Sequence, residues 1–408
     1  MRHVRIALFA TLLLIGSAAI ALAGDAPGSC RSAGKALAAA VADDAEFADF
    51  AERCVSLNQV QVLGSHNSYH IQPAPSLDLL LRLSDPPGPE LSLVWEYTHV
   101  PLDEQFSFQG IRQIELDVFL DPAGGLYAVP LGNVLVAAAG LPPDPDHDPD
   151  GVLLQPSFKV LHVQDLGFRS TCLTLASCLD EIQQWSSEHP RHLPLLVLIE
   201  LKDDPLPSDL PFVVPPLYQA EDLDDLDALI RSVFPSRQLV TPDDVRGKRK
   251  SLEEAVLKDG WPVLEESRGR VIFALDNGGE IRDLYVDGHP SLEGRVLFTD
   301  SSPGQPEAAF MKRNNPVSGF EEIQDLVQRG YIVRTRADAD TLEARFGVTG
   351  RRDAALESGA QFVSTDYPVP DPDFGTGYFV EIPDGAPARC NPLNAPPGCR
   401  NFALEVLE

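Results

Sequence analysis

The chain has 408 residues, of which 44% are hydrophobic, and a formal net charge of −29 at pH 7. This composition is typical of a globular protein with one large or two medium hydrophobic cores, and it argues against disorder and low complexity. Such acidity argues against binding to nucleic acid and against simple electrostatic adhesion to anionic lipid. It is compatible with a divalent cation, although a solvated acidic surface would account for most of the charge.

The first 23 residues have the pattern of a secretory signal peptide. A basic start, Met1–Arg5, leads into the apolar stretch Ile6–Leu22, and the small residues of Ala21-Leu22-Ala23 precede Gly24. The apolar stretch is too short and too rich in alanine for a retained membrane helix, and no later segment reaches the roughly 18 apolar residues that a span requires. We expect cleavage after Ala23 and a secreted protein, extracellular or periplasmic, without a transmembrane segment.

Six cysteines in an exported chain suggest three disulfides. The sequence alone leaves many pairings open, but the short separations favour local pairs. These pairs would be Cys30 with Cys54, Cys172 with Cys178, and Cys390 with Cys399. Metal binding by cysteine is the alternative, and no Cys-x-x-Cys with a matching His or Cys pair supports it.

Short apolar stretches that end in polar residues recur along the chain and predict strands. They are Val60–Leu63, Ile111–Val118, Phe158–His162, Leu195–Leu201, Val271–Leu275, Val296–Phe298, Tyr331–Val333 and Phe362–Ser364. Apolar residues at helical spacing separate several of them, at 173–187, 223–233, 320–328 and 352–358. Alternating strands and helices imply a parallel sheet, and eight such strands favour a closed (β/α)8 barrel. No Gly-x-Gly-x-x-Gly motif supports an open doubly wound sheet instead.

Two segments flank the predicted barrel, which we place at residues 58–382. Residues 24–57 include an amphipathic helix, Ala33–Cys54, that would close the base of the barrel. Residues 383–408 form a tail rich in proline and asparagine and closed by its own cysteines. The proline-rich connections 121–157 and 203–223 follow the second and fourth predicted strands, on the face where such barrels carry their sites. They are candidates for substrate or membrane contact.

Polar residues gather at the ends of the first four predicted strands. They are His66 and Asn67 after strand one, Glu115 and Asp117 on strand two, His162 after strand three, and Glu200 and Lys202 on strand four. Alternate residues of a strand share a face. Glu115 and Asp117 therefore point the same way, and so do Glu200 and Lys202. Singly, each residue has an ordinary explanation, such as a loop histidine, a turn asparagine or a surface ion pair. Together, three carboxylates on one rim repel one another unless a cation or a shared proton offsets the repulsion.

Oxygen ligands without cysteine suit a hard cation, calcium or magnesium, better than zinc. Calcium prefers roughly six to eight oxygen ligands, and Asn67, Glu115, Asp117 and Glu200 would supply part of this set. The remaining coordination positions would be open to water and substrate. The sequence therefore predicts a divalent cation site with room for a phosphate group.

These residues resemble a known family. The ordered set is His66-Asn67, Glu115-x-Asp117, His162 and Glu200. It is similar to the catalytic core of the phosphatidylinositol-specific phospholipases C, most closely their secreted calcium-dependent bacterial branch. The resemblance includes residues 334–338, 364–367 and 388–392, and so covers most of the chain after residue 23.

The resemblance implies a barrel fold, calcium at Asn67, Glu115, Asp117 and Glu200, and two histidines that act on the phosphoryl group. The implied reaction cleaves the glycerophosphate ester of phosphatidylinositol and releases diacylglycerol and an inositol phosphate. Calcium, with magnesium as the alternative, would neutralise charge and make the attacking hydroxyl more acidic. We expect Glu115 to accept the proton of the attacking hydroxyl. His66 would stabilise the phosphoryl oxygens, and His162 would assist proton transfer at the leaving group.

Lys202 and Arg336 are expected to bind phosphate or orient the polyhydroxylated headgroup, with an ordinary ion pair as the alternative for Lys202. The expected partner is a phospholipid at a membrane surface, bound peripherally by a monomer.

Two other functions stay open. A metal-dependent glycerophosphodiester phosphodiesterase also has a histidine near strand one, Glu-x-Asp on strand two and Glu-x-Lys further on. This chain has His66-Asn67 where that family shows His-Arg followed by a Glu-Asn-Thr turn. A catalytically silent barrel that binds lipid headgroups or calcium is the second alternative, and the presence of every expected ligand and both histidines disfavours it.

Overall fold

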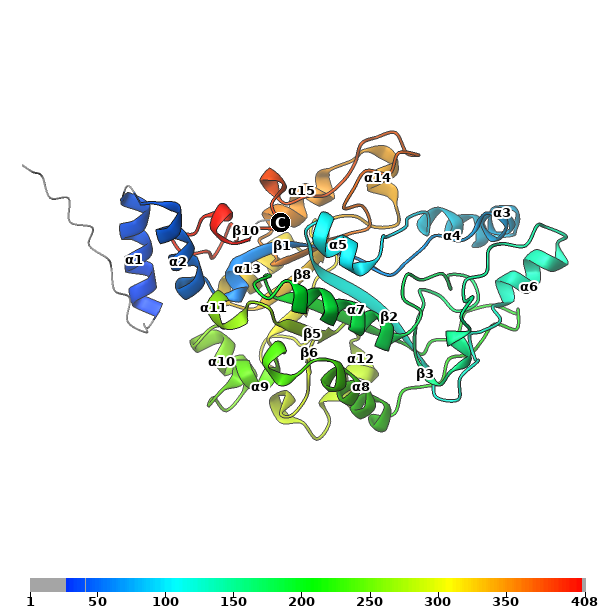
Figure 1. Ribbon diagram of the computed structural model, residues 1–408, viewed down its shortest axis with the longest axis horizontal. Coiled ribbons are helices and arrows are strands. Elements are labelled where there is room, and N and C mark those ends of the chain that lie inside the picture. The colour runs from blue at the N-terminus through cyan, green and yellow to red at the C-terminus, as the bar shows by residue number, and fades with distance from the viewer. Residues whose placement is uncertain (1–26, 41, 406–408) are drawn as a thin grey trace, which may run out of the picture.

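Parallel strands form a nearly closed barrel at the centre of the fold (Figure 1), and the computed structural model describes residues 27–40 and 42–405. In spatial order they run β6-β5-β4-β2-β1-β9-β8-β7, and a parallel bridge between Asp300 and Phe310 links the two outer strands. The strands are β1 (Val60–Ser65), β2 (Ile111–Asp121), β4 (Leu195–Lys202), β5 (Val271–Leu275), β6 (Leu297–Thr299), β7 (Phe310–Lys312), β8 (Ile332–Arg336) and β9 (Phe362–Thr365). The predicted (β/α)8 barrel is confirmed, whereas the predicted signal peptide, residues 1–23, lies outside the described residues.

The barrel strands are apolar because both of their faces are covered. All residues of β1, β2 and β5 are buried. Ile114, Leu116 and Val118 of β2 belong to the main hydrophobic core, and Glu115 and Asp117 alternate with them. The two carboxylates therefore share the other face of the strand.

Two strands differ from the prediction. The stretch expected as the third barrel strand forms β3 (Ser157–Val160), which pairs antiparallel with β2 outside the barrel, with Val118 opposite Val160. The strand that brings the barrel to eight is β7, which the sequence did not reveal because three residues carry no periodicity. A strand of eleven residues is longer than the usual five or six, so the end of β2 is free to pair with β3.

Helices surround the barrel, and further helices lie at its two ends (Figure 1). They are α1 (Pro27–Ala39), α2 (Asp44–Cys54), α3 (Pro75–Leu83), α4 (Gly88–Val94), α5 (Leu102–Phe108), α6 (Leu131–Ala138), α7 (Leu175–Glu188), α8 (Ala220–Val233), α9 (Pro242–Arg246), α10 (Leu252–Lys258), α11 (Leu264–Ser267), α12 (Gly279–Val286), α13 (Phe320–Arg329), α14 (Leu342–Phe346) and α15 (Gly350–Glu357). The four predicted barrel helices correspond to α7, α8, α13 and α15. Across residues 27–40 and 42–405, none of the helices has the length and hydrophobicity of a membrane span.

The predicted helix Ala33–Cys54 is two helices. The Asp43 side chain accepts a hydrogen bond from the backbone N–H of Glu46 (3.0 Å), and Glu46 accepts one from the backbone of Asp43 (3.1 Å). This capping box begins α2 and interrupts the helical pattern.

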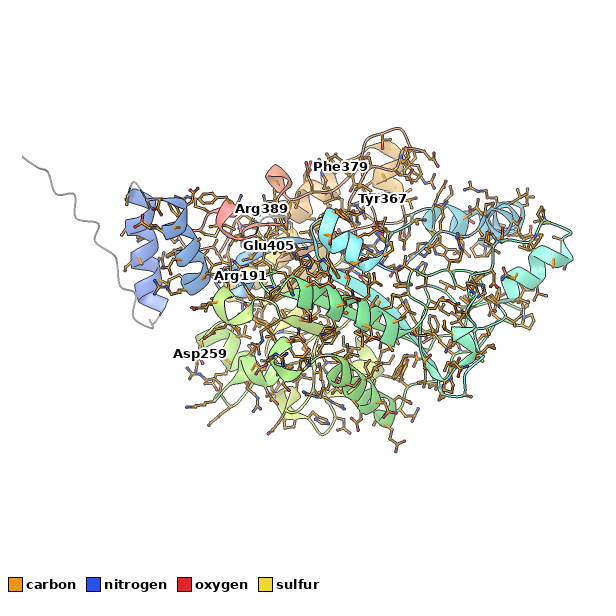
Figure 2. The ribbon with its side chains drawn as sticks, in the orientation of Figure 1. Arg191, Asp259, Tyr367, Phe379, Arg389 and Glu405 are labelled. Atoms are coloured by element: carbon orange, nitrogen blue, oxygen red, sulfur yellow. A yellow bond between two sulfur atoms is a disulfide. The ribbon has the colours of Figure 1, made fainter. Side chains whose placement is uncertain are left out.

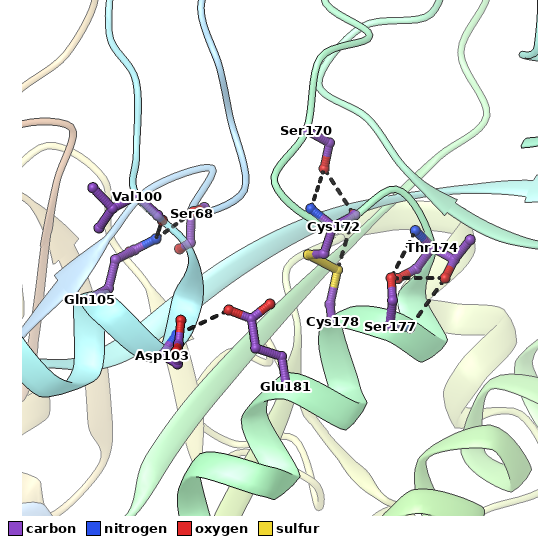
Figure 3. Close-up of a disulfide and its surroundings, with 10 residues drawn as sticks. All are labelled: Ser68, Val100, Asp103, Gln105, Ser170, Cys172, Thr174, Ser177, Cys178 and Glu181. Atoms are coloured by element: carbon purple, nitrogen blue, oxygen red, sulfur yellow. Dashed lines mark hydrogen bonds between the residues drawn. A yellow bond between two sulfur atoms is a disulfide. The ribbon is translucent and has the colours of Figure 1, made fainter. Parts of the chain in front are cut away.

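The three predicted disulfides are confirmed. Cys30–Cys54 joins α1 to α2, Cys390–Cys399 closes the tail, and Cys172–Cys178 holds the start of α7 (Figure 3). The tail also carries β10 (Ala388–Cys390), which pairs antiparallel with β1.

The tail is held to the base of the barrel by buried polar contacts. The guanidinium of Arg389 donates to the side-chain oxygen of Gln61 on β1 (2.7 Å). Glu405 accepts from Nε of the buried Arg112 on β2 (3.1 Å), and Figure 2 labels both tail residues. Removing one partner of a buried ion pair leaves an uncompensated charge, so these contacts fix the position of the tail.

A second apolar cluster lies at the other end of the molecule, where α3, α4 and α6 project in Figure 1. Its buried members come from α3, the end of α4, β2, the connection from β2 to α6, α6, and the segment after β3. They are Leu77, Leu81, Trp95, Phe119, Tyr127, Val136, Leu161, Leu166 and Phe168. We call this group the distal cluster; it supports the segments that follow the carboxyl ends of β1 and β2.

One buried histidine far from these ends predicts a pH dependence of stability. His192 donates through Nδ1 to the carbonyl of Leu193 (2.5 Å), and its Nε2 accepts from Ser186 (2.8 Å), which requires a neutral ring. Burial lowers the pKa of His192 from 6.5 to about 4, against the opposing hydrogen bond to Leu193. The unfolded chain therefore binds the extra proton first, and the free energy of unfolding falls as the pH drops from about 6.5 towards 4.

We expect this fall to be shallower in His192→Asn than in the wild type, by up to about 3 kcal/mol across the window. Urea unfolding at pH 6.5 and pH 4.5 would measure it. Equal pH dependence in the two proteins would contradict the neutral, buried histidine.

Candidate active site

Three carboxylates meet at the carboxyl ends of β2 and β4. Asp117 and Glu200 are direct neighbours in the parallel register, and Glu115 shares the face of Asp117. One oxygen from each of the three lies within 4.8 Å of the others. Glu115 and Asp117 are 3% and 0% exposed, whereas Glu200 is half-buried. Three acids held this closely require a compensating positive charge or a bound proton.

The turn after β1 brings Asn67 to the same strand. The backbone N–H of Ser68 donates to the carbonyl of Glu115 (2.9 Å), and the Ser68 hydroxyl accepts from the N–H of Glu115 (2.8 Å). Asn67 adopts a left-handed backbone, with φ of 43°, which asparagine tolerates better than most residues. Its side-chain N–H donates to the hydroxyl of Tyr97 (2.9 Å).

Two buried oxygens of this group have no hydrogen-bond donor. They are Oδ1 of Asn67 and Oδ1 of Asp117. A buried acceptor without a partner costs roughly 1–3 kcal/mol, unless a cation takes the place of the donor. The donor set is made of carboxylate and amide oxygens, which are calcium ligands. The four residues predicted to bind metal therefore fit a hard divalent cation.

Lys202 supplies the compensating charge within the protein. Its Nζ lies 3.1 Å from Oδ2 of Asp117 and 2.9 Å from Oε2 of Glu200. Burial on its own would lower the pKa of Lys202. The charges of Asp117 and Glu200 outweigh burial and raise this pKa above its ordinary value, so the ammonium form prevails. This is the ion pair weighed as the alternative for Lys202; its role in substrate binding stays a prediction.

Glu115 lies between the guanidinium of Arg334 and the imidazole of His66. Arg334 of β8 forms an ion pair with its Oε2, and Nε2 of His66 lies 3.8 Å from its Oε1. Burial raises the pKa of Glu115 to about 7, although Arg334 opposes the shift. A divalent cation at this carboxylate would favour its ionised form.

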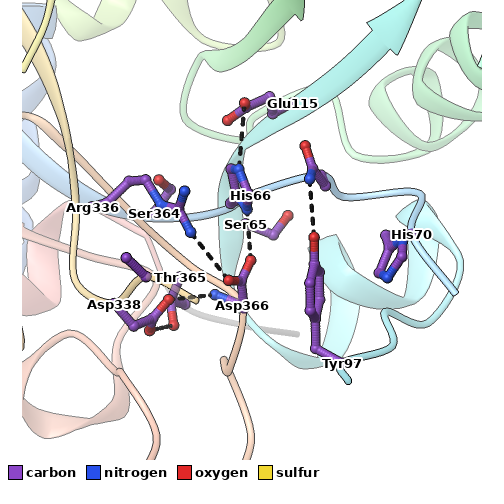
Figure 4. A network of polar contacts seen from close by, with 12 residues as sticks. Ser65, His66, His70, Tyr97, Glu115, Arg336, Asp338, Ser364, Thr365 and Asp366 are labelled. Carbon is purple, nitrogen blue, oxygen red and sulfur yellow. Dashed lines mark hydrogen bonds and ion pairs between the residues drawn. The ribbon is translucent and has the colours of Figure 1, made fainter. Parts of the chain in front are cut away.

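Asp366 orients His66 (Figure 4). Nδ1 of His66 lies 2.7 Å from Oδ1 of Asp366, whose Oδ2 accepts from Arg336 (3.1 Å). The backbone N–H of Asp366 donates to Asp338 (2.9 Å). Burial lowers the pKa of His66, and Arg336 and Arg334 lower it further. A negatively charged substrate group would oppose these effects.

Asp366 was not among the predicted site residues, although barrel closure points to it. β9 pairs in parallel with β1, with Thr365 opposite Ser65, so His66 and Asp366 are the next residues of two adjacent strands. The backbone N–H of His66 donates to the carbonyl of Thr365 (3.1 Å). The first and last barrel strands are neighbours in any closed barrel, and this adjacency is the signal that would have identified Asp366.

His162 joins the site from outside the barrel. It follows β3, which is not a barrel strand, and its ring centroid lies 4.9 Å from that of His70 and 5.6 Å from that of Trp95. Its segment is tied to the turn after β1 by a hydrogen bond from the N–H of Thr171 to the carbonyl of Tyr69 (2.8 Å).

His162 also has free hydrogen-bonding capacity. Its Nδ1 is buried without a partner. Burial lowers the pKa of His162, and the neighbouring His70 lowers it further. A neutral imidazole with an unused nitrogen is able to take part in proton transfer.

A cavity of about 790 Å³ lies at one side of the site. His162, Glu200 and Lys202 line it, together with Tyr218 and Asn277. All eight predicted site residues thus lie in one region, with Arg336 on β8 reaching it through Asp366. The arrangement is able to bind a cation beside a phosphate group and to exchange protons on two sides of it.

Comparison with solved structures finds matches at low sequence identity. A calcium-dependent phosphoinositol-specific phospholipase C from Pseudomonas sp. is 15% identical, with a TM-score of 0.48, over 83% of this chain and 96% of that chain. A Ca²⁺-dependent phosphatidylinositol-specific phospholipase C from Streptomyces antibioticus is 17% identical, with a TM-score of 0.47, over 79% and 97%. A glycerophosphoryl diester phosphodiesterase from Parabacteroides distasonis is 11% identical, with a TM-score of 0.27, over 80% and 89%.

No curated protein sequence matches the chain. The family model described as phosphoinositide phospholipase C, Ca²⁺-dependent, matches residues 55–392, which include the whole barrel and every residue of the site. The chain therefore belongs to the Ca²⁺-dependent phosphoinositide phospholipase C family.

Proposed function

We propose that this protein cleaves the glycerophosphate ester of phosphatidylinositol in a calcium-dependent reaction, releasing diacylglycerol and an inositol phosphate. Membership of the family supports the reaction class. The observation that carries the proposal is the convergence of Glu115, Asp117 and Glu200 beside the histidine–aspartate pair His66 and Asp366. Oxygen ligands for a hard cation and a proton-transfer group thus occupy one rim of the barrel.

Asn67, Glu115, Asp117 and Glu200 would hold the calcium ion. When bound, the ion neutralises phosphate charge and makes a coordinated hydroxyl more acidic. The unpartnered oxygens of Asn67 and Asp117 support this assignment. Once a cation balances the carboxylates, Lys202 is free to bind a phosphate oxygen of the substrate.

The protein side chains would then handle the protons. A headgroup hydroxyl oxygen bonds to phosphorus, its proton passes to Glu115, and the bond from phosphorus to the glycerol oxygen breaks. His162, whose pKa burial lowers, takes up a proton from water and gives it to that departing oxygen. His66 stabilises the charge on the phosphoryl oxygens once the phosphate charge and Asp366 offset the burial that lowers its pKa, and Asp366 fixes the ring. Arg336 supports Asp366 and is available to the headgroup.

Several finer assignments belong to this proposal as well. Three disulfides suit an oxidising compartment, which supports secretion of the mature chain. We propose that the protein acts as a monomer that binds phospholipid peripherally. The division into a helical segment at 24–57, a catalytic barrel at 58–382 and a tail at 383–408 stays a prediction.

The substrate class is tested by comparing phosphatidylinositol micelles with glycerophosphoinositol. We expect release of water-soluble inositol phosphate from the micelles, loss of this activity with a calcium chelator, and recovery when calcium is restored, because the ion supplies charge neutralisation. Faster hydrolysis of glycerophosphoinositol would identify the glycerophosphodiesterase alternative. Headgroup binding without turnover of either compound would identify the silent barrel.

The metal site is tested by Asp117→Asn. The substitution keeps the shape of the side chain but removes one charge, so we expect at least about a tenfold loss of calcium affinity and most of the turnover. Isothermal titration with calcium and the melting temperature separate binding from folding. Asp287→Asn, at the exposed end of α12, is the matched control. Unchanged calcium affinity in Asp117→Asn would remove this residue from the site.

The histidine roles are tested by single and double variants. His66→Ala and His162→Ala should each lower kcat by about a hundredfold, as expected for a lost acid, base or charge stabiliser. Asp366→Asn should lower kcat and shift the pH–rate profile, because it no longer favours the protonated ring of His66.

The coupling between His66 and Asp366 gives the sharper result. If Asp366 acts through His66, then His66→Ala with Asp366→Asn should be no slower than His66→Ala alone. Two effects that multiply would show that Asp366 acts independently of the histidine.

A further inference from the structure

The connection between β4 and α8, residues 203–219, exposes apolar side chains beside the cavity. Leu210, Val214 and Leu217 are 47%, 68% and 68% exposed. Single exposed leucines and valines are common on protein surfaces. Here three occur in one short segment, and Leu217 lines the same cavity as His162 and Lys202. The apolar surface is therefore continuous with the mouth of the candidate active site.

The connection is held in place from beneath. Phe212 and Val213 pack, partly buried, against the distal cluster. The backbone N–H of Val213 donates to the Asp165 side chain (2.6 Å), and the buried hydroxyl of Tyr218 donates to the carbonyl of Val118 (2.7 Å). Five prolines restrict the remaining backbone. The outward side chains are thus presented in a fixed arrangement, which lowers the entropy cost of binding.

We propose that this connection is a lipid-docking surface that inserts Leu210 and Val214 into the apolar region of a phospholipid bilayer. The inference rests on the proposed function, since a membrane lipid must reach the cavity from the bilayer. Insertion at the cavity mouth brings the headgroup towards the carboxylates without removing the acyl chains from the membrane. The energy comes from burial of apolar surface.

Charge distinguishes this surface from an electrostatic one. The connection carries Asp203, Asp204 and Asp209 and no lysine or arginine, and the whole chain has a net charge of −29. Attraction to anionic headgroups cannot hold such a surface on a membrane. Docking should therefore be strong on zwitterionic lipid and insensitive to ionic strength.

A second copy of the chain fits the surface less well. Stable protein interfaces bury about 800 Å² on each partner, more than three aliphatic side chains offer. A bilayer needs no such complementary area, because each inserted side chain contributes independently.

The test is co-sedimentation with phosphatidylcholine vesicles at low and at high salt. We expect Leu210→Ser with Val214→Ser to reduce the partition coefficient by roughly fivefold or more at both salt concentrations. Leu257→Ser is the control, because it also removes an exposed leucine (44% exposed) but on α10, and it should leave the partition coefficient unchanged. Equal vesicle binding by the wild type and the double variant would overturn the proposal, as would wild-type binding that high salt abolishes.

Two further measurements distinguish membrane docking from damage to the active site and from pairing of two copies. Turnover of monomeric short-chain phosphatidylinositol should be the same in wild type and double variant, while turnover on vesicles falls with binding. A wild-type dimer that the double variant converts to monomer, with vesicle binding unchanged, would assign the surface to a second copy and overturn the proposal. Vesicle binding requires no turnover, so a wild type that binds through this surface but cleaves no phosphatidylinositol would refute the proposed function and leave the docking surface supported.

Discussion

Mutual repulsion among buried carboxylates is the constraint on which the site depends. The parallel register of β2 and β4 places Asp117 beside Glu200, and the alternation of β2 adds Glu115. The protein compensates this negative charge with Lys202 on one side and Arg334 on the other. Both cations come from barrel strands, so the compensation is built into the scaffold and does not rely on mobile loops.

This arrangement gives the two cations different relations to a metal ion. Lys202 contacts Asp117 and Glu200 and would compete with a divalent cation for the same oxygens. Arg334 contacts Glu115 from the neighbouring side of the barrel. A divalent cation among the three carboxylates would therefore weaken the ion pairs of Lys202 more than the ion pair of Arg334. Metal binding would in this way free the Lys202 ammonium group for another partner.

Much of the fold and the site follows from local sequence patterns. Apolar strands such as β2 and β4, with polar residues at i and i+2, identify both the barrel and its carboxylates, since alternation is a local property. β7 escaped prediction because a three-residue strand has no pattern of its own, and the stretch at β3 has a strand pattern that does not reveal its antiparallel partner. Asp366 required knowledge that β9 lies beside β1, a contact between residues about 300 apart in the chain.

The attachment of the tail also determines when the barrel is completed during folding. β10 pairs with β1, and Glu405 binds Arg112, so contacts at the base join residues from opposite ends of the described chain. These contacts cannot form on the ribosome until synthesis has passed residue 405. Strand β1 is able to pair with β2 and β9 before then, but the base of the barrel stays uncovered until the tail docks, and contacts this distant in sequence favour a slow final folding step.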